Sequence, residues 1–284
     1  MFATVVIVFR EVLEAALLIG IIAAATRSIP GRNRWLLAGL MAGLAGSALV
    51  AASTEAIAGM AEGIGQEIFN ALVLGVAVLM LAWHNIWMSS HGKAMAAEAT
   101  NIGRAIRDGQ QERSILLIVV GLAVLREGSE TVLFLYAVSA SEASEASGAS
   151  GVSTILLGGL IGVLAGIAVG YTVYVGLLRV PLRWFFIATG MLVLLLAAGM
   201  ASQAAHFLIQ ANLLPSLAAP LWDTSIALPV TSVPGMLLHS LVGYDPRPAG
   251  MQLIFYIITL VAIATGMRLA SRSFQLNIHK RPVS

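Results

Sequence analysis

Two short charged stretches, REVLE at residues 10–14 and REGSE at residues 126–130, lie inside otherwise apolar sequence. Long hydrophobic runs flank each of them, so six ionisable groups fall where the surrounding sequence favours hydrocarbon. A charge at the centre of a membrane-spanning helix costs about 2.5 to 3.5 kcal/mol on insertion scales, so six unpaired charges would cost on the order of 15 to 20 kcal/mol. We therefore expect these groups to pair, to line water or to hold an ion.

The composition of the chain is that of an integral membrane protein. Hydrophobic residues make up 58% of the sequence and charged residues 11%, whereas a soluble domain carries about 25% charged residues. The chain has no cysteine, which excludes disulfides and thiolate metal ligands, so a metal site must use oxygen or imidazole donors. The first apolar stretch lacks a basic leader and holds Arg10, Glu11 and Glu14, so we interpret it as the first span rather than a signal peptide.

Seven segments of about 20 or more apolar residues are predicted to span the membrane. The connections after spans one, three, five and seven hold thirteen Arg and Lys residues, whereas the alternate connections hold only Arg247. This asymmetry places the amino terminus outside and the carboxyl terminus in the cytoplasm. The expected fold class is therefore an all-α, multi-pass protein of the cytoplasmic (inner) membrane, N-out/C-in, with seven transmembrane helices near residues 2–26, 35–57, 68–90, 114–139, 152–178, 184–209 and 250–271.

A duplication is predicted from the spacing of the two charged stretches, which lie 116 positions apart. Gly43 precedes Gly162 by 119 positions, and Gly75 precedes Gly190 by 115. Because each unit has three spans, an odd number, the second unit enters the membrane in the opposite sense and its charged stretch meets the first near mid-membrane. Inverted repeats are typical of transporters, although close helix packing alone also explains the glycines. We assign residues 1–284 to one membrane domain, with repeat one at 1–90, repeat two at 114–209 and a seventh span at 250–271.

The pattern Arg-Glu-x-x-Glu places its two carboxylates on one face of a helix, because positions i and i+3 are neighbours there. The arginine reaches the second glutamate at i+4. Two facing helices would then supply four carboxylates balanced by two guanidiniums, which suits a divalent cation, or a trivalent one with hydroxide. Carboxylate oxygen favours magnesium, calcium, manganese and iron over copper. The alternative is two local salt bridges that only rigidify the helices. The candidate ligands are Glu11, Glu14, Glu127 and Glu130, and the candidate charge-balancing residues are Arg10 and Arg126.

This doubled motif resembles the hallmark of the oxidase-dependent iron permeases, a family that includes bacterial EfeU-type ferrous iron permeases and fungal high-affinity iron permeases. The resemblance covers essentially the whole chain, including GQEIF at 65–69, WM at 87–88, PLWDTS at 220–225 and LVGY at 241–244. Ser129 stands where the family usually has leucine, which keeps every charged position and offers one extra hydroxyl to the site. The resemblance implies high-affinity import of Fe2+ or Fe3+ as a transported substrate, with no tightly bound cofactor, and an external iron-oxidising or iron-binding partner protein. It implies no nucleic acid partner.

Three further polar residues are candidates outside the doubled motif. Glu67 matches the Gln-Glu pair of the family and is expected to receive metal at the outer entrance. His84, inside the third span, is either a packing histidine, a ligand or a proton relay. Asp223 belongs to the acidic outer side. The proline-rich segment 213–248 is expected to re-enter the membrane or to lie on its surface. Residues 92–113 could form an amphipathic cytoplasmic helix, which we expect to be a connector rather than a ligand site.

Two other functions remain open at the level of sequence. One is an intramembrane carboxylate di-metal oxidase, which normally supplies Glu-x-x-His pairs; none occurs at these sites. The other is a broader divalent-cation transporter. The sequence also lacks the His-Glu-x-x-His pattern of metalloproteases and a Walker A loop. The absence of these motifs favours transport over catalysis, and iron as the substrate is what the family resemblance implies.

The predicted topology is testable with an alkaline phosphatase reporter, which folds only in an oxidising compartment. We expect a fusion after residue 100 to be inactive in intact cells and a fusion after residue 145 to be active. The reverse pattern would contradict both the orientation and the antiparallel placement of the two charged stretches.

Overall fold

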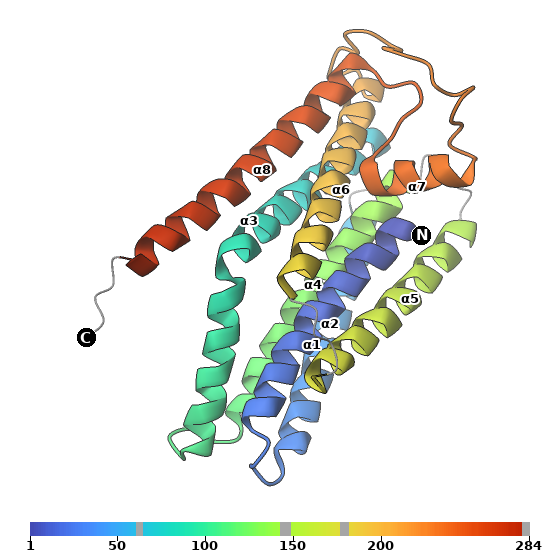
Figure 1. The fold of residues 1–284 in the computed structure, drawn as a ribbon. Coiled ribbons are helices and arrows are strands. Elements are labelled where there is room, and N and C mark those ends of the chain that lie inside the picture. Colours follow the sequence, from blue (N-terminus) through green and yellow to red (C-terminus); the bar gives the residue numbers. More distant parts are fainter. Residues whose placement is uncertain (61–64, 143–148, 177–181, 280–284) are drawn as a thin grey trace.

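A computed structural model describes residues 1–60, 65–142, 149–176 and 182–279 of the chain. Within these ranges the chain forms eight α-helices and no strand (Figure 1). The helices are α1 (Phe2–Ala25), α2 (Arg32–Met60), α3 (Gln66–Arg107), α4 (Ile115–Glu142), α5 (Ala149–Tyr174), α6 (Leu182–Gln210), α7 (Val233–Val242) and α8 (Gly250–His279).

Most of these helices are built to cross a membrane. Among the described residues, α2, α3, α5, α6 and α8 each contain a stretch that is long and apolar enough to span. The helices α1 and α4 have 24 and 28 residues, which is also sufficient length, but α1 holds three charged residues and α4 holds four. The chain is therefore a multi-pass helical membrane protein.

The helix bounds agree with the predicted spans within a few residues at most ends, and three segments differ. Residues 92–107 are helical, as the sequence allowed, but they continue α3 without a break to a length of 42 residues. This stretch is rich in alanine and has no proline, so nothing interrupts the helix until Gly109, which has a φ of 73°. The helix α5 ends at Tyr174 rather than at 178, just before Gly176 with a φ of 77°. The helix α8 extends past 271 to His279.

The first helices of the two halves run in opposite directions. In Figure 1 the amino terminus and the segment that joins α6 to α8 lie at the upper end, whereas the α1–α2 and α3–α4 connections lie at the lower end. The contacts agree: Ile7, early in α1, packs in one cluster with Phe134, late in α4, whereas Ile22 packs with Leu116 in another. The charged stretches, near the middle of α1 and α4, therefore lie at the same level.

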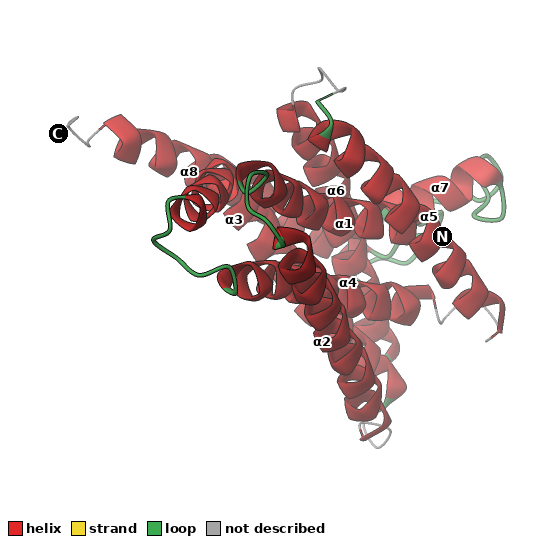
Figure 2. Cartoon of the chain, turned by 90° about the horizontal axis from the view of Figure 1, so that it is seen from below, coloured by secondary structure: helices red, strands yellow, loops and turns green. Residues whose placement is uncertain are grey.

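The helices α2 and α5 each pack against a helix that is distant in the sequence. The helix α2 packs along α4, and α5 packs along α1; Figure 2, seen from below, shows α2 lying over α4. Glycines make both contacts close. A Cβ atom added at Gly43 would lie 2.6 Å from Val124 Cβ, and one added at Gly162 would lie 2.8 Å from Val8 Cβ. Small residues allow membrane helices to pack backbone against side chain in this way.

Apolar side chains pack tightly on both sides of the charged level. One cluster, which we call the upper cluster, contains Ile7, Leu81 and Phe134 together with residues of α6 and α8. The other, the lower cluster, contains Ile22, Leu116, Val120 and Val124. Along α1 the charged stretch lies between these clusters, and along α4 it does so in the reverse order. The polar centre is thus enclosed between two apolar layers.

The proline-rich segment before α8 contains one short helix. The helix α7 has ten residues, about 15 Å, too short to cross the membrane. It starts at Ser232, whose hydroxyl accepts a hydrogen bond of 3.1 Å from the Gly235 amide, and it ends at Gly243 with a φ of 72°. It packs against α6 and α1 (Figure 1). The segment therefore caps one end of the bundle, in agreement with the expectation that it is no full span.

The close α1–α5 contact predicts that one methyl group destabilises the protein. In the Gly162→Ala variant the new Cβ meets Val8 Cβ and, at 2.9 Å, the carbonyl of Val5, and overpacking of this kind costs about 1–3 kcal/mol. We expect a lower midpoint of thermal unfolding for the purified protein in detergent. Gly159→Ala is the matched control on the same helix, because a Cβ there meets nothing within 4 Å. Equal midpoints for the two variants would contradict this packing.

Candidate metal centre

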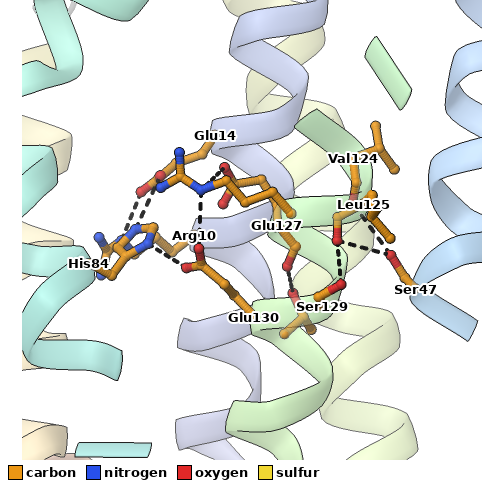
Figure 3. A network of polar contacts seen from close by, with 11 residues as sticks. Arg10, Glu14, Ser47, His84, Val124, Leu125, Glu127, Ser129 and Glu130 are labelled. Carbon is orange, nitrogen blue, oxygen red and sulfur yellow. Dashed lines mark hydrogen bonds and ion pairs between the residues drawn. The ribbon is translucent and has the colours of Figure 1, made fainter. Parts of the chain in front are cut away.

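Three helices place acidic and imidazole side chains around one point at the middle of the bundle. Glu11 and Glu14 come from α1, Glu127 and Glu130 from α4, and His84 from α3. Figure 3 shows Glu14, Glu130 and His84 directed toward one another, with Arg10 between the acidic groups. The i, i+3 spacing of each glutamate pair turns both carboxylates to the same face of its helix. The antiparallel crossing of α1 and α4 then brings the two pairs together.

The group is removed from solvent to an extent that is unusual for charged residues. Glu11 is 2% exposed, and Glu14 and Glu127 are each 6% exposed. Arg10 and His84 are each 3% exposed. Charges buried this deeply persist only when other charges, hydrogen bonds or a metal ion compensate them.

Each motif contains the salt bridge that its spacing predicts. Arg10 Nε donates to Glu14 Oε1 at 2.9 Å, and Arg126 Nε donates to Glu130 Oε1 at 3.2 Å. The two arginines differ in their surroundings. The Arg10 side chain is almost fully buried, whereas that of Arg126 is 36% exposed, and its guanidinium lies 4.6 Å from the centre of the Trp87 ring in a cation–π contact.

His84 lies between the two motifs. Its Nε2 is 3.4 Å from Glu14 Oε2, and its Nδ1 approaches Glu130 Oε2 still more closely. Neither ring nitrogen makes a well-formed hydrogen bond, and the same holds for one oxygen of each of the four glutamates. Buried polar atoms in this state normally indicate a bound water or ion that satisfies them.

The donor atoms are close enough to share one ion. One ligand atom from each of Glu11, His84, Glu127 and Glu130 lies within 4.8 Å of all the others. Ligands on opposite sides of an ion with bonds of about 2.1 Å lie about 4.2 Å apart. Small side-chain adjustments therefore suffice to close this group on a single cation, and Glu14 adjoins it through His84.

The other predicted site residues lie apart from this group. Ser129 donates its hydroxyl to the Leu125 carbonyl at 2.6 Å and, in Figure 3, lies on the side toward Ser47 rather than His84. Glu67 is exposed in the first turn of α3, seventeen residues or about 25 Å along the helix from His84. The structure therefore offers no contact from either residue to the buried carboxylates.

Asp223 is engaged at the protein surface. Its Oδ2 accepts a hydrogen bond of 2.9 Å from Arg247 Nε, and its Oδ1 accepts one of 2.6 Å from the Ser225 hydroxyl. These two partners lower the pKa of Asp223 to about 2. We therefore interpret Asp223 as a residue that ties the segment before α8 to itself, remote from the buried group.

One contact beside the second motif is not evident from the sequence. A Cβ at Gly128 would clash with the side chain of Ser47 on α2, and Ser47 donates to the Gly43 carbonyl at 3.0 Å. The corresponding place in the other half holds Val12 against Gly166, where an added Cβ would lie 2.8 Å from Val12 Cγ1. A small–large pair is thus reversed between the halves. Only the unequal third positions of the two motifs, valine and glycine, signal it in the sequence.

Comparison with known proteins is decisive about the class of this protein. Residues 1–276 match the model of the "Iron permease FTR1 family". The chain belongs to that family. The Ferrous iron permease EfeU of Shigella sonnei (strain Ss046) is 27% identical over 277 residues, which cover 96% of this chain and 97% of that protein. The EfeU protein of Yersinia pestis is 29% identical over 274 residues, covering 92% and 91%. No solved structure matches the chain.

Membership in this permease family confirms the resemblance seen in the motifs. It also makes the chain a transporter and not an enzyme, so the di-metal oxidase alternative has no support. From the sequence, His84 was a packing histidine, a ligand or a proton relay, and the structure places it between the two motifs. A lone histidine in an apolar span is the only signal that pointed to it.

The reversed pair beside the second motif predicts a rescue. Gly128→Val alone should lower the amount of folded protein, because the new side chain occupies the volume of Ser47. Adding Ser47→Gly copies the Val12–Gly166 arrangement of the other half and should restore the thermal midpoint by most of the loss. Size-exclusion profiles and unfolding curves of the single and double variants measure this. Additive destabilisation in the double variant would contradict the proposed equivalence.

Proposed function

We propose that this permease imports iron across the cytoplasmic membrane through the buried site between α1 and α4. The single observation that carries the proposal is the convergence of both Arg-Glu-x-x-Glu motifs, with His84, on one enclosed point. Family membership supports iron as the transported substrate. The inner membrane as its location follows from the spans and the orientation inferred from the basic residues.

The proposed architecture has seven spans, N-out/C-in, arranged as two inverted three-helix repeats and a last helix. Matched contacts support the repeats. Gly39 approaches Val120 as Gly158 approaches Thr4, and Gly43 approaches Val124 as Gly162 approaches Val8. In both cases the glycines are 119 positions apart and their partners are 116 apart. Parts of the proposed repeats, residues 61–64, 143–148 and 177–181, lie outside the described residues. The contacts among the described residues support the proposed relation of α1–α5 to α4–α2.

Electrostatics favours a cation at this place. Four carboxylates and two guanidiniums leave two negative charges uncompensated when all are ionised. In a region of low dielectric this imbalance is costly, and Fe2+ neutralises it without further groups. Fe3+ would need a hydroxide to reach the same balance. The doubled motif is thus a binding site whose charge matches its cargo.

The two apolar clusters define what transport requires. The upper cluster lies between the site and one end of the bundle, and the lower cluster lies between the site and the other. Iron can reach the buried carboxylates only when one cluster separates, and it can leave only when the other does. Alternating access would pass through an intermediate in which both clusters are packed.

Uptake of labelled iron tests the proposal directly. Purified protein in proteoliposomes should accumulate iron, supplied as Fe2+ or as Fe3+, with and without a pH gradient. The same assay with and without an external iron-oxidising or iron-binding protein tests the partner that we infer at the outer surface. Failure of both iron forms to enter under any gradient would contradict import by this chain alone.

Neutral substitutions at the four carboxylates should stop transport. Each of Glu11→Gln, Glu14→Gln, Glu127→Gln and Glu130→Gln removes an anionic ligand while keeping the shape of the side chain. We expect uptake to fall by more than about tenfold, the lower end of the loss seen when even an outer-shell partner is removed. The folded fraction, measured by size-exclusion chromatography, should remain sufficient for assay.

A double variant separates ligation from a structural salt bridge. Glu14→Gln leaves Arg10 without its carboxylate partner in the membrane, so instability alone would also reduce uptake. Arg10→Met combined with Glu14→Gln removes that unpaired charge. We expect the double variant to be folded but inactive, because neutralising the helix does not replace an oxygen donor. Robust iron uptake by this variant would show that the carboxylate serves only to balance the arginine.

Glu67 is proposed to act at an earlier step, capture at the outer entrance. It is exposed at the start of α3, at the same end of the bundle as the amino terminus. Glu67→Gln should raise the iron concentration for half-maximal uptake with a smaller loss of maximal rate, because the buried ligands stay intact. Kinetics over a range of iron concentrations measure both values. Unchanged uptake of iron by the Glu67→Gln variant at limiting iron would show that Glu67 has no role in capture.

A further inference from the structure

We propose that His84 is a direct ligand of the transported ion, and that its imidazole nitrogen makes the site select Fe2+ over Mg2+ and Ca2+. This inference rests on the proposed function, because it concerns the same buried site. It adds a third helix, α3, to a site that the doubled motif alone assigns to α1 and α4. It also replaces a purely carboxylate site with one of mixed nitrogen and oxygen donors.

The position of the ring supports ligation. His84 is 3% exposed, and its donor atom lies within 4.8 Å of carboxylate oxygens from Glu11, Glu127 and Glu130. The two motifs contribute to the group from opposite sides of the imidazole, with Glu14 near Nε2 and Glu130 near Nδ1. An ion within the carboxylates is therefore also within reach of a ring nitrogen.

The hydrogen bonding of the ring supports the same conclusion. Both ring nitrogens are buried and face carboxylate oxygens, Nε2 at 3.4 Å from Glu14 Oε2 and Nδ1 in closer contact with Glu130 Oε2, and neither has a backbone carbonyl or hydroxyl of the described residues as a partner. A packing histidine normally satisfies at least one nitrogen with a neutral hydrogen-bonding group; His206 on α6 illustrates this, since its Nε2 lies 3.0 Å from the side-chain amide nitrogen of Gln210. The remaining alternative is a charged imidazole that only bridges Glu14 and Glu130 as an ion pair.

Ligand chemistry turns this position into selectivity. Mg2+ and Ca2+ prefer oxygen ligands alone, whereas imidazole suits iron and the later divalent transition metals. A site of four carboxylates without the histidine would offer Ca2+ and Mg2+ only the oxygen ligands that they prefer. One nitrogen donor shifts the preference toward Fe2+. The alternative of a broad divalent-cation transporter would require that this nitrogen contribute nothing.

The ligand also links separate parts of the bundle. The helix α3 packs on α6 and α8 as well as on α1 and α4. An ion held jointly by His84 and the carboxylates therefore connects the paired motif helices to the α6–α8 side. An ion that binds both His84 and the carboxylates connects α3 to α1 and α4 across the interface where the clusters must separate. An ion bound by the carboxylates alone does not connect these helices.

Electron spin echo measurements on the full chain in detergent test the ligand directly, with Mn2+ as the paramagnetic probe. We expect the wild-type protein to show modulation from a coordinated imidazole nitrogen, and the modulation pattern to change when histidine is labelled with 15N. His84→Gln should abolish it, and His206→Gln, the matched control, should leave it intact. Wild-type protein that binds Mn2+ without any nitrogen modulation would overturn the role of His84, and this result needs no variant that folds.

Affinity measurements under anaerobic conditions test the selectivity. His84→Gln should weaken Fe2+ binding by about tenfold or more, comparable to other losses at metal sites, and should change Mg2+ and Ca2+ binding by less than about twofold. His84→Lys keeps a positive charge for the ion-pair alternative, and Fe2+ binding retained in that variant would overturn the proposal. If the wild-type protein binds no Fe2+ at all, the proposed function fails; if it binds Fe2+ and His84→Gln binds it equally, only the present inference fails.

Discussion

The burial of charge at the middle of a membrane bundle is the constraint on which the rest of this structure depends. Four carboxylates, two guanidiniums and an imidazole lie where lipid and apolar side chains surround them, and none of them can be solvated there at low cost. Pairing within each motif removes part of the cost. The antiparallel approach of α1 and α4 removes more, because it lets the two motifs face one another. A bound cation would compensate the negative charge that remains.

This approach is possible because α2 and α5 exchange partners between the halves. Each presents glycines to the first helix of the other half, so that side chains such as Val8 and Val124 lie against backbone. If these glycines carried Cβ atoms, the helices would stand further apart and the carboxylates would not converge. The small residues thus contribute to the metal centre although none of them touches it. Tight apolar packing lies on both sides of the centre along α1 and α4.

The two halves are similar but not equal, and the differences lie at the site. Arg10 is buried, whereas Arg126 is partly exposed and stacked on Trp87. His84 enters from α3, and no histidine of α6 lies in the metal-competent group of described residues. In a strictly symmetric site, the surroundings of the ion would be the same toward both ends of the bundle. Unequal surroundings give the ion distinct neighbours toward each end of the bundle, which suits a permease that must receive and release its cargo on opposite sides.

The sequence by itself determined the class of the molecule and predicted the four carboxylates that we propose as its site. The hydrophobic runs set the helix positions because each must cover the membrane thickness, and the i, i+3 and i+4 spacing set the face and the salt bridge of each motif. These properties depend only on residues close together in the chain, so they can be predicted from the sequence. The helix at residues 92–107 is also local in origin, but the loss of hydrophobicity after span three hid its continuity with α3.

Only the tertiary structure decided which helices are partners and which polar residues meet. No spacing indicates that α2 packs on α4 rather than on α1, or that Ser47 needs a glycine at position 128. The same applies to His84, which stands alone in its span and acquires a role only because α3 crosses the paired motifs at that level. Asp223, Ser129 and Glu67 carry comparable chemistry but lie elsewhere. Side-chain type is written in the sequence, whereas distance between remote side chains arises from packing, and metal coordination depends on that distance.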